Sequence, residues 1–282
     1  MPFVSVIIPT YNHAVFIRDA LDSVFQQTFD DFEVIVVDNY SEDNTEDLVR
    51  SYNDSRLRYM KFRNQGIIGA SRNVGVRNAT GELVAFLDSD DLWYPRKLEL
   101  CVQAFSRERE IILVCHDEYC TREGKILKRY HYGPYTENMY HSLLFKKNCV
   151  STSAAVLKRD IHNKLNGFSE NKDFVGCEDY EFWMRLSREG KFYFIPEVMG
   201  EYRIHGKNMI SNPVRLACNV LRVLEHHYML LPSETQVQAR KKYKRRHARV
   251  MASCAKSLFL NKNIKGLVWA YKAFQELAGS CL

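Results

Sequence analysis

Three carboxylates follow directly on a short apolar run in the first half of the chain. Residues 83–87 read LVAFL, and Asp88, Asp90 and Asp91 come next, with Ser89 among them. An uninterrupted apolar run predicts a strand that is buried on both faces. Carboxylates crowded at its end repel one another, and a divalent cation with oxygen ligands would neutralise that repulsion. The cluster therefore predicts a metal site, although Asp91 could equally be a helix-capping residue.

Two earlier apolar runs also end in residues suited to ligand binding. The first, VSVIIP, ends at Pro9 and leads into Thr10 and Tyr11, and the second, FEVIVVD, ends at Asp38. The carboxyl ends of neighbouring parallel strands meet in one crevice, where such sheets bind ligands. Tyr11 could stack on a nucleobase, or it could be a loop aromatic. Asp38 could accept a hydrogen bond from a base or ribose, or it could anchor the turn that leads through Ser41 into the next helix. Together with the acid cluster, they favour a nucleotide site.

Neither G-x-G-x-x-G after the first strand nor G-x-x-x-x-G-K-[ST] occurs in the chain. These glycine-rich motifs cradle phosphates with backbone amides, so a diphosphate here needs another counter-charge. A metal ion held by Asp90 would supply it.

Strands alternate with amphipathic helices over the first 90 residues. Further strands are expected at 57–62 and 83–87, and helices at 17–25, 45–52 and 70–78. This alternation predicts an α/β fold with a mostly parallel central sheet flanked by helices. The second half is less regular: strands are expected at 111–116, 154–157, 192–195 and 201–204, a helix at 180–188, and helices from 212 onward with breaks near 232 and 261–263.

The composition is that of an ordinary globular protein. Of 282 residues, 46% are apolar and 26% charged, and no apolar stretch approaches the roughly 20 residues that span a bilayer. No signal peptide is recognisable, so we expect a cytoplasmic protein, with possible contact to the inner face of the membrane. The eight cysteines form no C-x-x-C pair, which favours free buried thiols.

Several motifs occur together in the order found in glycosyltransferase family 2. They are SVIIPTYN, SEDNT behind Asp38, GASRNVGVRNATGE, LVAFLDSDD, GCEDYEFWMRL and YRIHGKNMIS. The chain resembles this family over about residues 4–211. The resemblance implies the GT-A fold in residues 1–211, with a nucleotide-binding part at about 1–92 and an acceptor-binding part at about 93–211. Residues 212–282 would form a basic helical extension.

The resemblance also implies roles for particular residues. Asp179 would be the catalytic base and Glu178 a supporting group. The nucleotide would be bound by Pro9, Thr10, Tyr11, Asp38, Arg72, Asn73, Asp88 and Ser89, and the metal by Asp90 with Asp88 and His205. Asn39-Tyr40 stands where many members have Asp-Gly, which changes the loop behind Asp38.

The chemistry of sugar transfer requires such a base. A sugar hydroxyl is a poor nucleophile, and a positioned base contributes about 10²–10⁴-fold. Asp179 opens a predicted helix, so it could instead be an N-terminal cap. The metal would be Mn²⁺ or Mg²⁺, and an imidazole ligand suits Mn²⁺ at least as well. Trp93 could stack on a sugar face or lie in the core, and Ser153 could approach the acceptor or form a turn.

Residues 240–272 contain eleven Lys or Arg and no acid. A solvated helix face is the ordinary explanation of such a segment. Docking on an anionic membrane, binding nucleic acid and forming a homodimer compete with it. Because no nucleic-acid-binding motif accompanies the charge, we expect no nucleic-acid partner and favour the membrane surface.

The sequence therefore predicts an inverting, metal-dependent hexosyl- or N-acetylhexosaminyltransferase. It would move a sugar from a nucleotide donor, UDP-sugar above all, to a glycan or lipid-linked acceptor in cell-surface glycan or polysaccharide synthesis. One alternative is a catalytically silent nucleotide-sugar-binding or scaffold protein. Another is a nucleotidylyltransferase, whose first strand should lead into a glycine-rich loop bearing Arg and Lys, whereas PTYNHAVF has neither glycine nor lysine.

Overall fold

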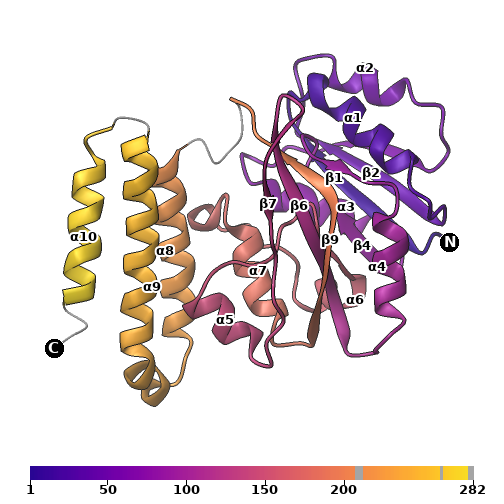
Figure 1. Cartoon of the computed structure of the whole chain (residues 1–282). Helices are drawn as coiled ribbons and strands as arrows, with labels where there is room; N and C mark the ends of the chain where they lie inside the picture. Colours follow the sequence, from indigo (N-terminus) through magenta and orange to yellow (C-terminus); the bar gives the residue numbers. More distant parts are fainter. Residues whose placement is uncertain (207–211, 261–262, 279–282) are drawn as a thin grey trace.

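The structure, a computed structural model, describes residues 1–206, 212–260 and 263–278. Within these residues a nine-stranded sheet is covered by helices on both faces, and three further helices stand beside it (Figure 1). The strand order is β3-β2-β1-β4-β8-β6-β9-β5, with β7 paired to β6. This is the α/β architecture with a helical extension that the sequence predicts.

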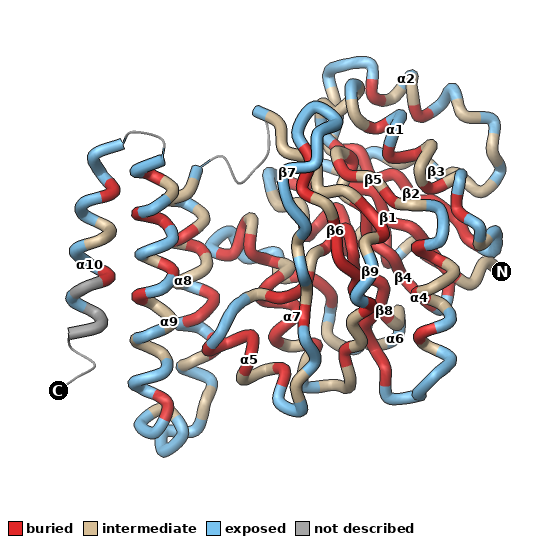
Figure 2. The backbone as a smooth tube through the Cα atoms, in the orientation of Figure 1, coloured by how far each residue is buried: buried red, intermediate tan, exposed pale blue. Residues whose placement is uncertain are grey.

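The first four strands of the sheet are parallel. They are β1 (Val4–Thr10), β2 (Phe32–Asp38), β3 (Leu57–Lys61) and β4 (Leu83–Phe86). Side chains of β1 alternate between two cores: Ile8 packs with α1 (Ala14–Phe25), and Ile7 with α3 (Ile68–Arg77). Helix α2 (Thr45–Arg50) lies beside α1. Burial on both faces explains why β1, β2 and β4 read as uninterrupted apolar runs, whereas the edge strand β3, LRYMK, is only partly buried (Figure 2).

The second half of the sheet is mixed, whereas β1–β4 are all parallel as the sequence predicts. Strand β8 (Val156–Lys158) pairs antiparallel with β4 and with β6 (Ile111–Arg122). Strand β9 (Lys191–Arg203) runs parallel to β6 and antiparallel to the two-residue strand β5 (Leu92–Trp93), and β7 (Lys125–Tyr130) forms a hairpin with β6. The two strands expected at 192–195 and 201–204 are one strand, because β9 continues past Pro196 through register shifts.

The helices after β5 enclose the second half of the sheet. They are α4 (Lys97–Phe105), α5 (Met139–Phe145), α6 (Arg159–Lys164), a 3₁₀ turn at Lys172–Phe174, and α7 (Glu178–Leu186). Helix α7 begins two residues before the expected start at 180. Glu178 and Asp179 therefore lie in its first turn.

Three helices form the C-terminal extension: α8 (Pro213–Met229), α9 (Ser233–Leu260) and α10 (Gly266–Ala278). Val223 and Leu224 of α8 belong to the same hydrophobic cluster as Trp183 of α7, so the extension packs on the sheet domain.

The proposed boundary at 211 and the second half of the YRIHGKNMIS motif lie outside the described residues. None of the described helices has the length and apolar character needed to cross a bilayer. The described cysteines are free thiols.

Candidate active site

The end of β4 gives each of its three carboxylates a different environment. Asp91 is buried: its Oδ1 accepts from the Arg203 amide at 3.0 Å and its Oδ2 from the Ser153 hydroxyl at 2.6 Å. Burial raises the pKa of Asp91 well above its ordinary value. Asp91 thus ties the loop after β4 to β9 and to the segment before β8, so it is an internal loop residue and not a helix cap.

Asp90 lies in a group of three residues that could hold a metal ion. Ligand atoms of His13, Asp90 and His205 all lie within 4.8 Å of one another. His205 Nε2 is 2.8 Å from Asp90 Oδ2, and the His205 ring stacks on Phe16 at 4.3 Å between centroids. These residues come from the ends of β1, β4 and β9, so the crevice at the carboxyl edge of the sheet assembles them. One carboxylate and two imidazoles fit Mn²⁺ better than Mg²⁺, which prefers oxygen ligands.

His13 is a candidate ligand that the sequence analysis missed. It is the N-cap residue of α1, and its Nδ1 lies 2.8 Å from the Ser89 hydroxyl, a contact that fixes the ring and leaves Nε2 for a ligand. Burial lowers the pKa of His13 and so favours the neutral imidazole that binds metals. Its position three residues after Thr10, at the edge of the sheet that carries the acid cluster, was the available signal.

Asp88 lies outside this group of three. The buried Arg72 guanidinium donates to Asp88 Oδ1 at 2.7 Å and to Glu178 Oε1 at 2.8 Å. One guanidinium thus joins the end of β4 to the first turn of α7. The acid cluster and the Glu178-Asp179 pair therefore lie close together.

Asp179 is a partly exposed carboxylate at the start of α7. Its Oδ1 accepts from the Tyr180 amide at 2.7 Å and its Oδ2 from the Thr152 hydroxyl at 3.2 Å. Burial and the charge of Glu178 raise the pKa of Asp179 to about 6, against the opposing effect of Arg72. The N-cap position of α7 is Cys177, so Asp179 is not the N-cap residue. A carboxylate with this pKa can accept a proton near neutral pH.

The predicted nucleotide-binding residues at the ends of β1 and β2 lie side by side. Thr10 pairs with Asp38 in the sheet, and the buried Thr10 Oγ1 has no hydrogen-bond partner among the described residues. Asp38 is fully buried: Oδ1 accepts from the Ser41 hydroxyl at 2.6 Å, and Oδ2 from the Tyr59 hydroxyl at 2.5 Å. These bonds match the alternative in which Asp38 anchors the turn.

The loop after β2 presents an aromatic ring at this edge. Tyr40 has φ = 60°, the left-handed conformation that a glycine adopts without strain, and it stands where the family pattern has glycine. Its ring is exposed, and the Cζ atom of the Arg63 guanidinium lies 4.3 Å from the ring centroid. Tyr11 is also exposed, 48% of its surface being accessible, whereas Pro9 is buried in β1.

Three predicted site residues point elsewhere. The buried amide of Asn73 bonds to both backbone groups of Phe168 and to Glu170 Oε1, so it holds the loop after α6 and does not line the nucleotide crevice. Trp93 is 3% exposed and donates its indole N–H to the Ser153 carbonyl at 2.7 Å, which leaves no ring face for a sugar. Ser153 is buried; its hydroxyl bonds to Asp91 and accepts from the Asp88 amide, so it positions the acid cluster.

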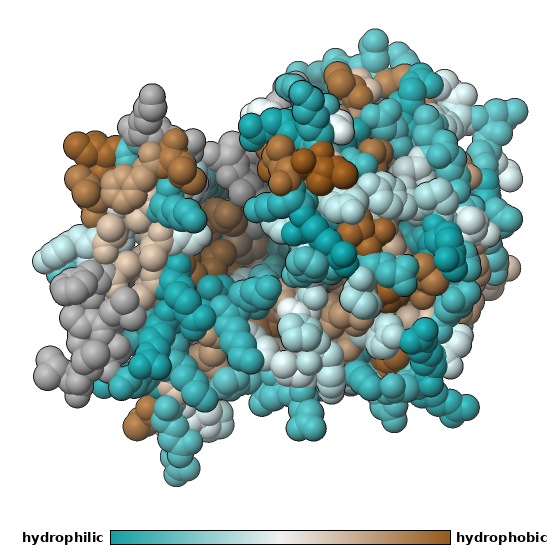
Figure 3. Space-filling view, viewed as in Figure 1, coloured by the Kyte–Doolittle hydropathy of each residue, from teal (hydrophilic) through white to brown (hydrophobic). Residues whose placement is uncertain are grey.

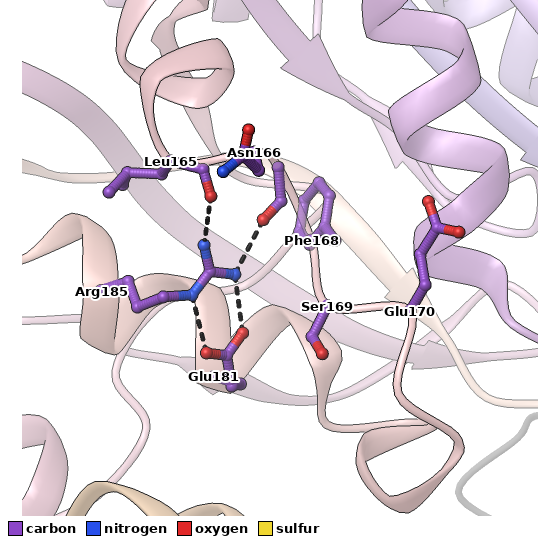
Figure 4. Close-up of a pocket in the computed structure, with 8 residues that line it drawn as sticks. Leu165, Asn166, Phe168, Ser169, Glu170, Glu181 and Arg185 are labelled. Atoms are coloured by element: carbon purple, nitrogen blue, oxygen red, sulfur yellow. Dashed lines mark hydrogen bonds and ion pairs between the residues drawn. The ribbon is translucent and has the colours of Figure 1, made fainter. Parts of the chain in front are cut away.

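A small pocket lies where the loop held by Asn73 meets α7 (Figure 4). Arg185 forms its wall, donating to both carboxylate oxygens of Glu181 and to the carbonyls of Leu165 and Gly167. These bonds brace the loop, and the pocket contains none of the predicted site residues.

Comparison with known proteins identifies the family. The model of glycosyl transferase family 2 matches residues 5–165, more than half of the chain. The chain belongs to this family.

Curated relatives support this assignment. An uncharacterized glycosyltransferase of Rickettsia prowazekii, RP339, is 30% identical over 215 residues, which cover 72% of this chain and 64% of the relative. Chondroitin synthase of Escherichia coli is 27% identical over 248 residues, covering 86% of this chain. The match spans only 34% of that synthase, so this chain corresponds to part of it.

Solved structures share the fold. Residues 1–349 of Staphylococcus aureus TarS superpose with a TM-score of 0.71 at 20% identity, covering 99% of this chain and 81% of that chain. The mannosyltransferase PcManGT of Pyrobaculum calidifontis gives 0.66 at 19% identity, covering 99% and 86%. The chain has the GT-A fold that these glycosyltransferases share.

Proposed function

We propose that this protein is an inverting, metal-dependent glycosyltransferase that uses a nucleotide-sugar donor, with Asp179 as the catalytic base. The observation that carries the proposal is the position of Arg72 between Asp88 and Glu178. This bridge links the residues suited to a metal and a diphosphate with a carboxylate suited to accept a proton.

The residues of α7 would activate the acceptor. Oδ2 of Asp179 would accept the proton of a sugar hydroxyl, taking the place of the Thr152 hydrogen bond, while the Tyr180 amide holds Oδ1. As it loses this proton, the oxygen of the acceptor hydroxyl attacks the anomeric carbon on the face opposite the diphosphate. The bond from that carbon to the diphosphate breaks, and the configuration inverts. Glu178 lies beside Arg72, and its charge helps to raise the pKa of Asp179.

The other wall of the crevice would receive the departing diphosphate. Asp90, His205 and His13 would hold the divalent cation. When bound, that cation neutralises the charge of the leaving group. Tyr11 and Tyr40 offer exposed rings for a nucleobase, and the unpartnered Thr10 hydroxyl a hydrogen bond.

UDP-sugar is our first choice of donor. TarS has been solved in complex with UDP-GlcNAc, and PcManGT in complex with GDP-Man and Mn²⁺. We propose a glycan or lipid-linked acceptor and a role in cell-surface glycan or polysaccharide synthesis. A screen of nucleotide sugars, by donor turnover and by thermal stabilisation with and without Mn²⁺, tests the proposal, since a ligand bound only by the folded state raises the unfolding temperature.

The matched variants for this screen are Asp90→Asn and Asp173→Asn. Asp173 is an exposed carboxylate outside the crevice, so its variant should behave as the wild type. We expect Mn²⁺-dependent turnover of at least one nucleotide sugar, retained in Asp173→Asn and lost in Asp90→Asn. Donor binding without turnover in the wild type would instead indicate a catalytically silent binding protein. Release of pyrophosphate from a nucleoside triphosphate would indicate a nucleotidylyltransferase.

A further inference from the structure

Helix α10 presents several large apolar side chains to the outside. Leu267, Val268 and Tyr271, together with Ile264 just before the helix, follow the spacing i, i+3, i+4, i+7 and occupy an arc of about 100°. The opposite face, which is buried, carries the small residues Gly266 and Ala273. Trp269 is partly buried and packs against the hydrophobic core, so α10 is apolar on its inner side and also on the side that faces outward.

This surface continues onto the end of α9. We call the whole set the apolar patch; its members are 46–78% exposed and comprise Phe259, Leu260, Ile264, Leu267, Val268 and Tyr271. Brown side chains gather at this end of the helical extension in Figure 3. Contiguous exposed apolar surface of this kind marks an interaction site, because water is a poor solvent for it.

The charged residues next to the apolar patch in sequence are positive. Lys256, Lys265 and Lys272 are exposed next to its members in sequence, and residues 240–272 contain no acid. Lys244 and Lys272 also line one pocket between α9 and α10, together with Met251 and Gln275. Two ammonium groups beside a methionine suit a phosphate attached to a hydrocarbon chain.

We propose that the apolar patch docks on an anionic lipid bilayer, with α10 lying in the plane of the interface. An amphipathic helix of this kind buries its apolar face at the boundary of headgroups and acyl chains, while its lysines contact anionic headgroups. A two-fold dimer through the same patch would bring the lysines of both copies together, since such an interface apposes identical surfaces. Lipid phosphate removes that repulsion.

Vesicle flotation of the full chain tests the docking surface. The vesicles would be pure phosphatidylcholine or phosphatidylcholine with about 30% phosphatidylglycerol, in about 0.1 M and about 0.5 M salt, because screening shortens the range of surface charge. The variant Leu267→Ser/Val268→Ser removes two exposed apolar side chains and leaves every charge. The matched control Ile126→Ser/Leu127→Ser removes two equally exposed side chains from β7.

We expect the wild type and the β7 control to float with anionic vesicles at low salt, and the bound fraction to fall at high salt and on neutral vesicles. The α10 variant should bind at least tenfold more weakly, with its unfolding temperature unchanged. Equal vesicle binding by both double variants would overturn the proposal. So would a wild type that binds no vesicle but forms a dimer that the α10 variant cannot form, as measured by sedimentation velocity.

Discussion

The two walls of the crevice differ in how their polar groups are paired. On the wall built from α3 and α7, Arg72 is buried between two carboxylates, so its charge is neutralised within the protein. On the opposite wall, His13 and His205 lie beside Asp90, an arrangement whose donor atoms all suit a cation. From this comparison we propose that folding fixes the base wall and that a bound cation completes the metal wall.

Replacing Arg72 with Ala should give the largest effect on stability. Glu178 would remain buried without its counter-ion, which typically costs about 3–5 kcal/mol. Urea unfolding measures the loss. The control is Arg50→Ala, which breaks an exposed ion pair with Glu46 and should cost well under about 1 kcal/mol. Equal losses in the two variants would show that the bridge does not stabilise the base wall.

Replacing His13 with Ala should affect the metal wall without destabilising the protein. Loss of one of three ligands should weaken Mn²⁺ binding by about tenfold or more, because the second imidazole and the carboxylate remain. Isothermal titration with Mn²⁺, in the presence of UDP, measures this affinity. His226→Ala, at an exposed position on α8, serves as the control. Unchanged Mn²⁺ affinity in His13→Ala would remove His13 from the ligand set.

Replacing Glu178 with Gln should give a smaller, diagnostic shift in pH dependence. The base must be ionised to act, so kcat/KM should fall as the pH drops below the pKa of Asp179, about 6. The charge of Glu178 raises that pKa, and its removal should therefore move the acidic limb to lower pH. A pH–rate profile of both proteins provides the measurement. A limb that stays in place, or moves upward, would mean that another group controls it.

The sequence predicted those parts of the fold in which burial leaves a recognisable run of apolar residues. Strands β1, β2 and β4 are buried on both faces and appear as apolar runs, whereas the exposed strand β7 reads KILKRY and was not expected. Strand β9 continues through Pro196, a residue that ordinarily interrupts a strand. Register shifts of this kind depend on the neighbouring strand, which the local sequence does not reveal.

The direction of side chains was the least predictable property of the site. Arg72 and Asn73 are adjacent, but successive helical residues point about 100° apart. Arg72 therefore reaches Asp88 and Glu178, while Asn73 bonds to the loop at Phe168. In the same way, a composition rich in acids and aromatics near residue 90 could not show that Trp93 is buried.

The turnover number of Asp179→Asn tests most directly the claim that Asp179 is the catalytic base. It is measured at pH 8 with the donor found in the screen, and the Mn²⁺–UDP affinity of the same variant is measured beside it. The amide keeps the size of the side chain and cannot accept the proton of the acceptor. We predict that turnover falls about 10²–10⁴-fold while Mn²⁺–UDP affinity stays unchanged. Turnover near the wild-type rate would contradict the assignment of Asp179 as the catalytic base.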